Sequence, residues 1–78
     1  MTREDLKPII LEALSSPGKR ETIAKIAKFV WDNYEKDLRA SGDFFYTWQY
    51  DLRWAGDGLV KEGKLDKTSH RGTWERLG

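Results

Sequence analysis

The chain has 78 residues, which suits one domain, and we treat residues 1–78 as a single domain. It contains no cysteine, which excludes disulfides and thiolate zinc sites. Its 14 basic and 13 acidic residues give a formal net charge of +1, so the chain is not a strongly basic nucleic-acid binder. No apolar run approaches the roughly 20 residues that span a bilayer, and no signal-peptide core is present, so we expect a cytoplasmic protein without a membrane partner.

Residues 3–15 predict a first amphipathic helix. Thr2 is a candidate N-cap, and Asp5 follows three residues later, where an acid favours the first helical turn. The sequence Ser15-Ser16-Pro17-Gly18 is expected to end the helix. Its core-facing side consists of apolar residues at helical spacing: Leu6, Ile9, Ile10, Ala13 and Leu14.

A short edge strand and a second helix are predicted next. Lys19-Arg20-Glu21 is long enough for the strand, and Thr22 can cap the helix that follows. This helix is predicted to be the longest of the three, and Ala40-Ser41-Gly42-Asp43 breaks it. Its apolar stripe contains Ile23, Ile26, Ala27, Val30, Tyr34 and Leu38, with Trp31 beside it.

The segment Asp43–Leu65 predicts a third helix that ends at Gly63 and continues into a strand. Asp43 is a candidate N-cap for this helix. Its apolar stripe is formed by Phe45, Trp48, Leu52, Ala55 and Leu59. The opposite side carries Tyr46, Tyr50, Arg53 and Asp57, flanked by Thr47, Gln49 and Trp54. Two tyrosines and an arginine are unusual on a surface that only meets water, so this side is a candidate for binding.

Residues 64–77 predict a β-hairpin with a polar, basic tip. Two alternating segments, 64–68 and 73–77, flank the turn Ser69-His70-Arg71-Gly72. Leu65, Trp74 and Leu77 are expected to face inward. The order α-β-α-α-β-β, with three helices closed by a small antiparallel β-hairpin, predicts an α+β fold of the winged helix-turn-helix class.

The second half of the chain also carries a pattern known from one family: Arg53-Trp54-Ala55, Leu59, Lys61, Gly63, Leu65 and Arg71-Gly72-Thr73-Trp74. This pattern resembles the N-terminal winged-helix domain of Mrr-type restriction endonucleases, and the likeness extends from Leu6 to Leu77. The resemblance implies DNA binding in a restriction system or in transcription regulation. It does not imply nuclease activity, because the nuclease motif of those enzymes belongs to a separate domain of a longer chain.

Three groups of residues are therefore candidates for contact with double-stranded DNA. On the third helix, which would enter the major groove, they are Tyr46, Thr47, Gln49, Tyr50 and Arg53. On the hairpin, which would meet the backbone or minor groove, they are Lys67, Ser69, His70 and Arg71. At the start of the second helix, where phosphate meets free N–H groups, they are Lys19, Arg20, Thr22 and Lys25.

Each group also has an ordinary structural interpretation. Arg53 either contacts DNA or pairs with Asp57 or Asp43, and the turn and helix-start charges either meet phosphate or only solubilise the chain. Residues 40–63 contain 2 basic and 4 acidic side chains, a net charge of −2, so this helix cannot hold DNA by itself. We therefore expect its N-terminal half to probe the groove while the other two groups supply the attraction.

The alternative hypothesis is a winged helix for protein–protein interaction or dimerisation. It accounts for the near-neutral charge and for the aromatic surplus at Tyr46, Tyr50 and Trp54. An enzyme is not expected, because no nucleophile–base arrangement or phosphate loop occurs, and so small a domain should lack a large concave site. We expect no metal, since His70 is the only histidine, and neither a cofactor nor a small-molecule substrate.

Overall fold

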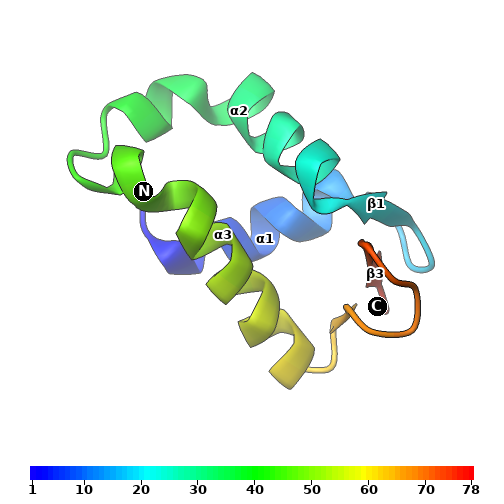
Figure 1. Ribbon diagram of the computed structural model, residues 1–78. Helices are drawn as coiled ribbons and strands as arrows, with labels where there is room; N and C mark the ends of the chain where they lie inside the picture. Colours follow the sequence, from blue (N-terminus) through cyan, green and yellow to red (C-terminus); the bar gives the residue numbers. More distant parts are fainter.

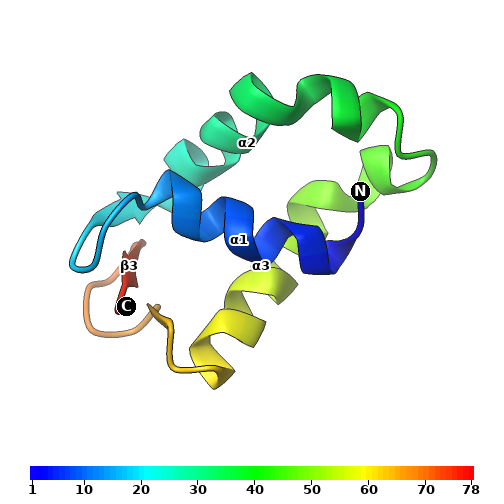
Figure 2. The ribbon, with the colours of Figure 1, turned by 180° about the vertical axis from the view of Figure 1, so that it is seen from behind.

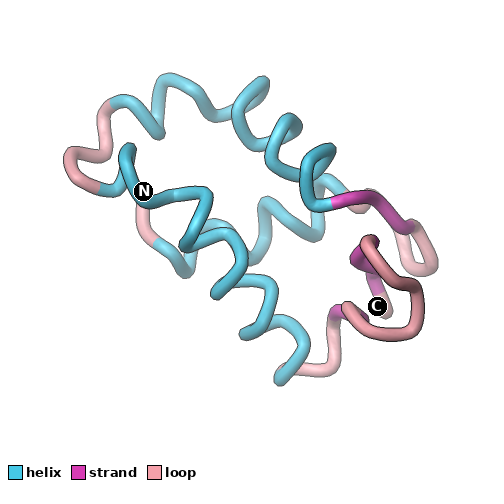
Figure 3. The backbone as a smooth tube through the Cα atoms, viewed as in Figure 1, coloured by secondary structure: helices cyan, strands magenta, loops and turns pink.

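The computed structural model describes all 78 residues and contains three helices and three short strands. The elements are α1 (Arg3–Ala13), β1 (Arg20–Thr22), α2 (Ile23–Arg39), α3 (Phe44–Lys61), β2 (Leu65–Asp66) and β3 (Thr73–Arg76). The fold is therefore α+β with the predicted element order. Helices form most of the molecule, and the strands gather at one end, close to the C-terminus (Figure 1, Figure 3). None of the three helices is both long and apolar enough to cross a bilayer.

The strands form one antiparallel sheet in the order β1-β3-β2. The predicted edge strand is confirmed, although it begins at Arg20, one residue later than expected. In the register between β1 and β3, Arg20 is opposite Glu75 and Thr22 is opposite Thr73. Because α2 begins directly after Thr22, this register brings the end of the β2–β3 turn (residues 67–72) next to the first turn of α2.

The core lies where the three helices meet, and the predicted stripes form most of it. On α3, Trp48, Leu52, Ala55 and Leu59 are buried, as predicted, while Phe45 is only partly buried. Helix α1 lies behind α2 and α3 in Figure 1 and in front of them in Figure 2, so it covers one side of both helices. The opposite sides of α2 and α3 stay open to solvent.

The sheet packs against the second half of α3 at a very close contact. A Cβ atom on Gly56 would lie 2.6 Å from the ring of Trp74, a distance that side-chain carbons do not adopt. Trp74 is itself buried, as predicted, so its ring has little room to move away. Glycine at this position therefore lets β3, and with it the β2–β3 turn, sit directly on α3.

Some predicted details of the helices are wrong. Helix α1 ends at Ala13 instead of residue 15, and the chain turns away at Ser15, which has a left-handed φ of 45°. Helix α3 is the longest, with 18 residues against 17 in α2. Asp43 does not cap α3 with its side chain, because its backbone is already helical and its carboxylate accepts no hydrogen bond from the helix.

The predicted inward position of Leu77 is also wrong, because this side chain is 48% exposed. Successive side chains of a strand point to opposite faces, so a residue three positions after Trp74 cannot share its inward face. Arg76, two positions after Trp74, lies on the inward side instead. Its guanidinium donates a hydrogen bond to the backbone carbonyl of Leu11 at the end of α1.

Candidate nucleic-acid interface

The outward face of α3, turned away from the core, carries the exposed residues Tyr46, Tyr50, Arg53 and Trp54. Tyr46 is 82% exposed and Tyr50 is 61% exposed, so both rings are available to a partner. Arg53 is exposed and takes part in no ion pair. The structure therefore excludes the pairing with Asp57 or Asp43 that was the alternative to a free Arg53 side chain. Gln49 is also exposed, one turn before Arg53 on the same side of the helix.

Asp51 is the one buried charged residue of the chain, and it is neutralised from α1. The Arg3 guanidinium lies 2.7 Å from the Asp51 carboxylate, and the Thr47 hydroxyl donates a second hydrogen bond to it at 2.9 Å. Thr47, a predicted DNA contact, thus uses its hydroxyl hydrogen inside the protein. Arg3 also covers the ring of Trp54, with its guanidinium carbon 5.5 Å from the ring centroid.

The sequence analysis missed this role of Arg3, which lies 48 residues from Asp51. A weak signal existed, because Asp51 borders the apolar stripe of α3 at Leu52 and Ala55. A carboxylate at such a boundary needs a cation from another element. Nothing in the sequence, however, indicates which of the 14 basic residues supplies it.

Asp57, the other acidic residue of α3, is also paired with a cation. The Lys67 ammonium forms an ion pair with Asp57 and lies 4.6 Å from the centroid of the Trp74 ring. The Lys67 side chain is only 21% exposed, so this predicted DNA contact is largely engaged within the protein. Lys67 therefore joins the β2–β3 turn to α3 instead of extending into solvent.

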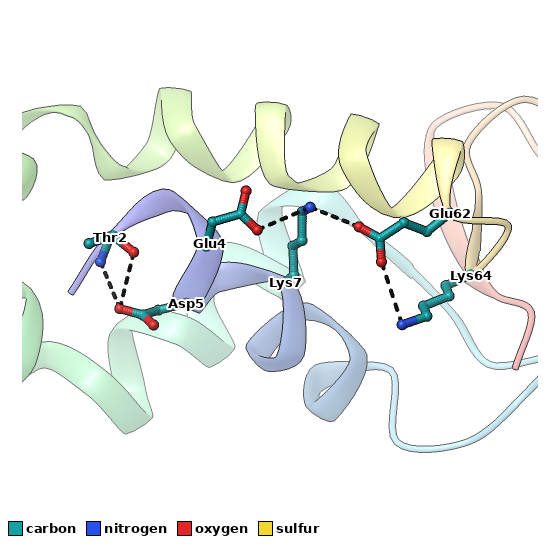
Figure 4. A network of polar contacts seen from close by, with 6 residues as sticks. All are labelled: Thr2, Glu4, Asp5, Lys7, Glu62 and Lys64. Carbon is teal, nitrogen blue, oxygen red and sulfur yellow. Dashed lines mark hydrogen bonds and ion pairs between the residues drawn. The ribbon is translucent and has the colours of Figure 1, made fainter.

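Glu62, directly after α3, belongs to a chain of ion pairs that reaches α1 (Figure 4). The Lys7 ammonium lies between Glu62, at 2.8 Å, and Glu4, at 3.1 Å. The hydrogen bonds to Glu62 and Glu4 raise the pKa of Lys7, and the bond from Lys7 lowers the pKa of Glu62. Of the 4 acidic residues in 40–63, only Asp43 lacks a cationic partner.

At the start of α2 the structure leaves the predicted cations unpaired. Lys19, Arg20 and Lys25 are exposed, and none of them forms an ion pair. Thr22 is confirmed as the N-cap, since its hydroxyl accepts a hydrogen bond from the backbone N–H of Lys25 at 3.2 Å. Glu21 is the carboxylate in this segment without a cationic partner, and it is partly buried.

The β2–β3 turn is organised by Asp66. The Ser69 hydroxyl, followed by the backbone N–H groups of Ser69 and Thr68, donates hydrogen bonds to the Asp66 carboxylate and lowers the pKa of Asp66 to about 2. His70 lies 3.3 Å from Glu75, a contact that becomes an ion pair when the imidazole is protonated. Arg71 is exposed and has no ion-pair partner. The predicted turn is thus held by hydrogen bonds at its start and presents one unpaired cation near its end.

Eight of the 13 predicted candidates fall into two groups. Exposed cations without partners are Lys19, Arg20, Lys25, Arg53 and Arg71. Thr22, Thr47 and Lys67 instead serve the fold through the contacts described above. Figure 1 shows α3, α2 and the β2–β3 turn on one side of the molecule, away from α1. Figure 2 shows that α1 covers the other side.

A groove of about 500 Å³ separates α2 from α3, although the sequence predicted no large concave site. Helix α2 contributes Ala24, Ala27, Lys28 and Trp31, and α3 contributes Phe45, Trp48 and Gln49. The lining is mostly apolar and contains no histidine, carboxylate or hydroxyl group that could act as acid, base or nucleophile. No group of three or more His, Asp or Glu side chains with metal-binding geometry occurs among the 78 residues.

Comparisons of the chain with protein-family models, with curated proteins and with solved structures found no match. The resemblance to the winged-helix domain of Mrr-type endonucleases therefore stays a prediction. The candidate interface is accordingly argued from its own contacts and charges.

Proposed function

We propose that this chain is a winged helix-turn-helix module that binds double-stranded DNA without catalysing a reaction on it. In this proposal α3 enters the major groove, and the β2–β3 turn contacts the backbone or the minor groove. The element order and the sheet order β1-β3-β2 are compatible with such a fold. A cytoplasmic restriction or transcription-regulating system is the setting that we propose.

One observation carries the proposal: most acidic side chains near the candidate interface are paired inside the protein, and most basic ones are not. Arg3 neutralises Asp51, and Lys67 neutralises Asp57. The unpaired cations Arg53, Arg71 and Lys25 remain exposed. A chain with a net charge of only +1 thus presents a locally basic surface, which attracts phosphate over about 8 Å at physiological salt.

Titration of a labelled duplex into the protein at low salt tests the proposal. We expect salt-sensitive binding, weakened about tenfold by Arg53→Ala and by Arg71→Ala, with the salt slope reduced by about one for each lost phosphate contact. Lys36→Ala is the matched control, because Lys36 is also exposed and unpaired but lies in the last turn of α2. The proposal fails if no duplex binds, or if the control variant loses as much affinity as the other two.

A second candidate function is a protein-interaction or dimerisation module, and the exposed aromatic rings of α3 favour it. Tyr46, Tyr50 and Trp54 follow one another at intervals of four residues. The rings of Tyr50 and Trp54 pack edge to face, with 6.2 Å between their centroids. Tyrosine, tryptophan and arginine are the residues enriched at protein-interface hot spots. Sedimentation equilibrium would reveal a dimer, and unchanged self-association of the Trp54→Ala variant would exclude these rings from its interface.

A further inference from the structure

The groove between α2 and α3 exposes apolar surface that no element of the chain covers. The Trp31 ring stacks on Trp48 with 6.3 Å between centroids and lies 6.2 Å from Phe45. Trp48 is buried and forms the floor, whereas Trp31 and Phe45 are only partly buried. These three aromatic side chains thus form a continuous apolar lining of an open groove. Exposed apolar surfaces of this kind are typical of sites that accept a partner.

The two ends of this groove differ. At one end, the Arg39 guanidinium carbon lies 5.2 Å from the centroid of Trp31 and 5.5 Å from that of Phe45, and Glu35 holds Arg39 at 2.8 Å. At the other end, near the start of α2, the wall consists of Ala24 and Ala27. Small side chains allow the backbone of a partner to come close. The groove therefore has a closed end and an open end.

The unpaired positive charge beside the groove lies at its open end. Asp32 and Glu35, the acidic residues on this part of α2, are paired with Lys28 and Arg39. Arg53, one turn beyond Gln49 on the same side of α3, has no partner. Lys25, in the same first turn of α2 as Ala24, has none either, and the N-terminus of α2 adds a partial positive charge at this end. A partner that carries acidic residues beside its apolar ones matches this end.

We propose that the groove docks an acidic amphipathic helix of a partner protein, an interaction that goes beyond the proposed DNA binding and shares Arg53 and Lys25 with it. Apolar residues at positions i, i+3, i+4 and i+7 of that helix would fill the space over Trp31 and Trp48. Its acidic residues would lie near Arg53 and Lys25 at the open end. A nucleic-acid strand fits less well, because Lys28 and Gln49 are the only polar residues that line the groove.

The probe is a synthetic helical peptide with leucines and a tryptophan at these spacings and glutamates on its other face. Control peptides carry lysine in place of glutamate, or serine in place of the apolar residues. Titration with amide chemical-shift mapping should shift the signals of Ala24, Ala27 and Gln49. Ala24 is exposed and lines the groove, so a leucine side chain in its place would partly fill the groove. Ala24→Leu should therefore weaken binding about tenfold. Ala40→Leu, exposed at the end of α2, should leave binding unchanged.

Any one of the following four outcomes would contradict the proposal. Equal binding of the lysine peptide would show that charge does not select the partner. Equal binding by Ala24→Leu and Ala40→Leu would place the peptide elsewhere. A dimer in sedimentation equilibrium that Ala24→Leu abolishes would identify a second copy of the chain as the occupant. Duplex DNA that shifts Ala27 and Trp31 most strongly would assign the groove to nucleic acid instead.

Discussion

The two sides of α3 carry charged residues of opposite sign, and they differ in whether those residues are paired. On the side that faces α1, Asp51 is paired with Arg3, and Glu62 just beyond the helix is paired with Lys7. On the outward face, Arg53 has no partner, and the same is true of Lys61 in the last turn. The comparison shows that the formal charge of a segment is a poor guide to its surface charge, because cations from other elements neutralise the acids of this segment and leave Arg53 and Lys61 uncompensated.

The largest effect is expected on the side that faces α1. Arg3→Ala leaves the Asp51 carboxylate buried without a cation, so the free energy of unfolding should fall by about 2 kcal/mol. Urea denaturation measures this change. Arg53→Ala, on the outward face, should change it by less than about 0.5 kcal/mol. Equal losses in the two variants would contradict the distinction between the two sides.

A double-mutant cycle sharpens the same comparison. Once Asp51 is replaced by alanine, removal of Arg3 should cost much less than it does in the unmodified protein, because no buried charge remains to be compensated. The sum of the losses in unfolding free energy of the two single variants should therefore exceed the loss in the double variant. Strict additivity would show that Arg3 stabilises the fold mainly through its contact with Trp54.

A smaller effect is expected where the outward face meets the β2–β3 turn. Asp57→Asn removes an acid and releases Lys67, so affinity for duplex DNA should rise about threefold at low salt. Fluorescence anisotropy measures the change. Asp37→Asn, which alters an exposed acid without an ion-pair partner near the end of α2, is the control for net charge and should have a smaller effect. A fall in affinity would mean that the Lys67–Asp57 pair holds the turn in its binding position.

The smallest effect concerns the turn itself. The pKa of Asp66 is about 2 in the folded chain, below its ordinary value of 3.8. A lowered pKa means that this group stabilises the fold fully above pH 3.8 and loses that contribution as the pH falls toward 2. Carbon NMR of the Asp66 carboxyl should show a midpoint near pH 2. Asp66→Asn should keep the turn but lose this pH dependence, and a midpoint near pH 4 would contradict the hydrogen-bonded turn.

Much of the fold could be predicted, because it depends on local patterns. Spacing of apolar residues located α1, α2 and α3, the hydroxyl of Thr22 marked the start of α2, and alternation located the hairpin. The errors at Asp43 and Leu77 are of a different kind. Asp43 had suitable side-chain chemistry but a helical backbone, and Leu77 broke the two-residue period that the prediction should have applied.

The residue types of the candidate site could be predicted from the sequence. Which of these side chains are paired inside the protein and which are free could not. Periodicity alone placed Tyr46, Tyr50 and Arg53 on an outward face, because a helix repeats every 3.6 residues whatever surrounds it. Only the packing of distant segments decided that Arg3 neutralises Asp51, that Lys67 is held by Asp57, and that a groove opens between α2 and α3. Ion pairs and grooves arise between elements, and their partners are set by three-dimensional distance, which no local pattern contains.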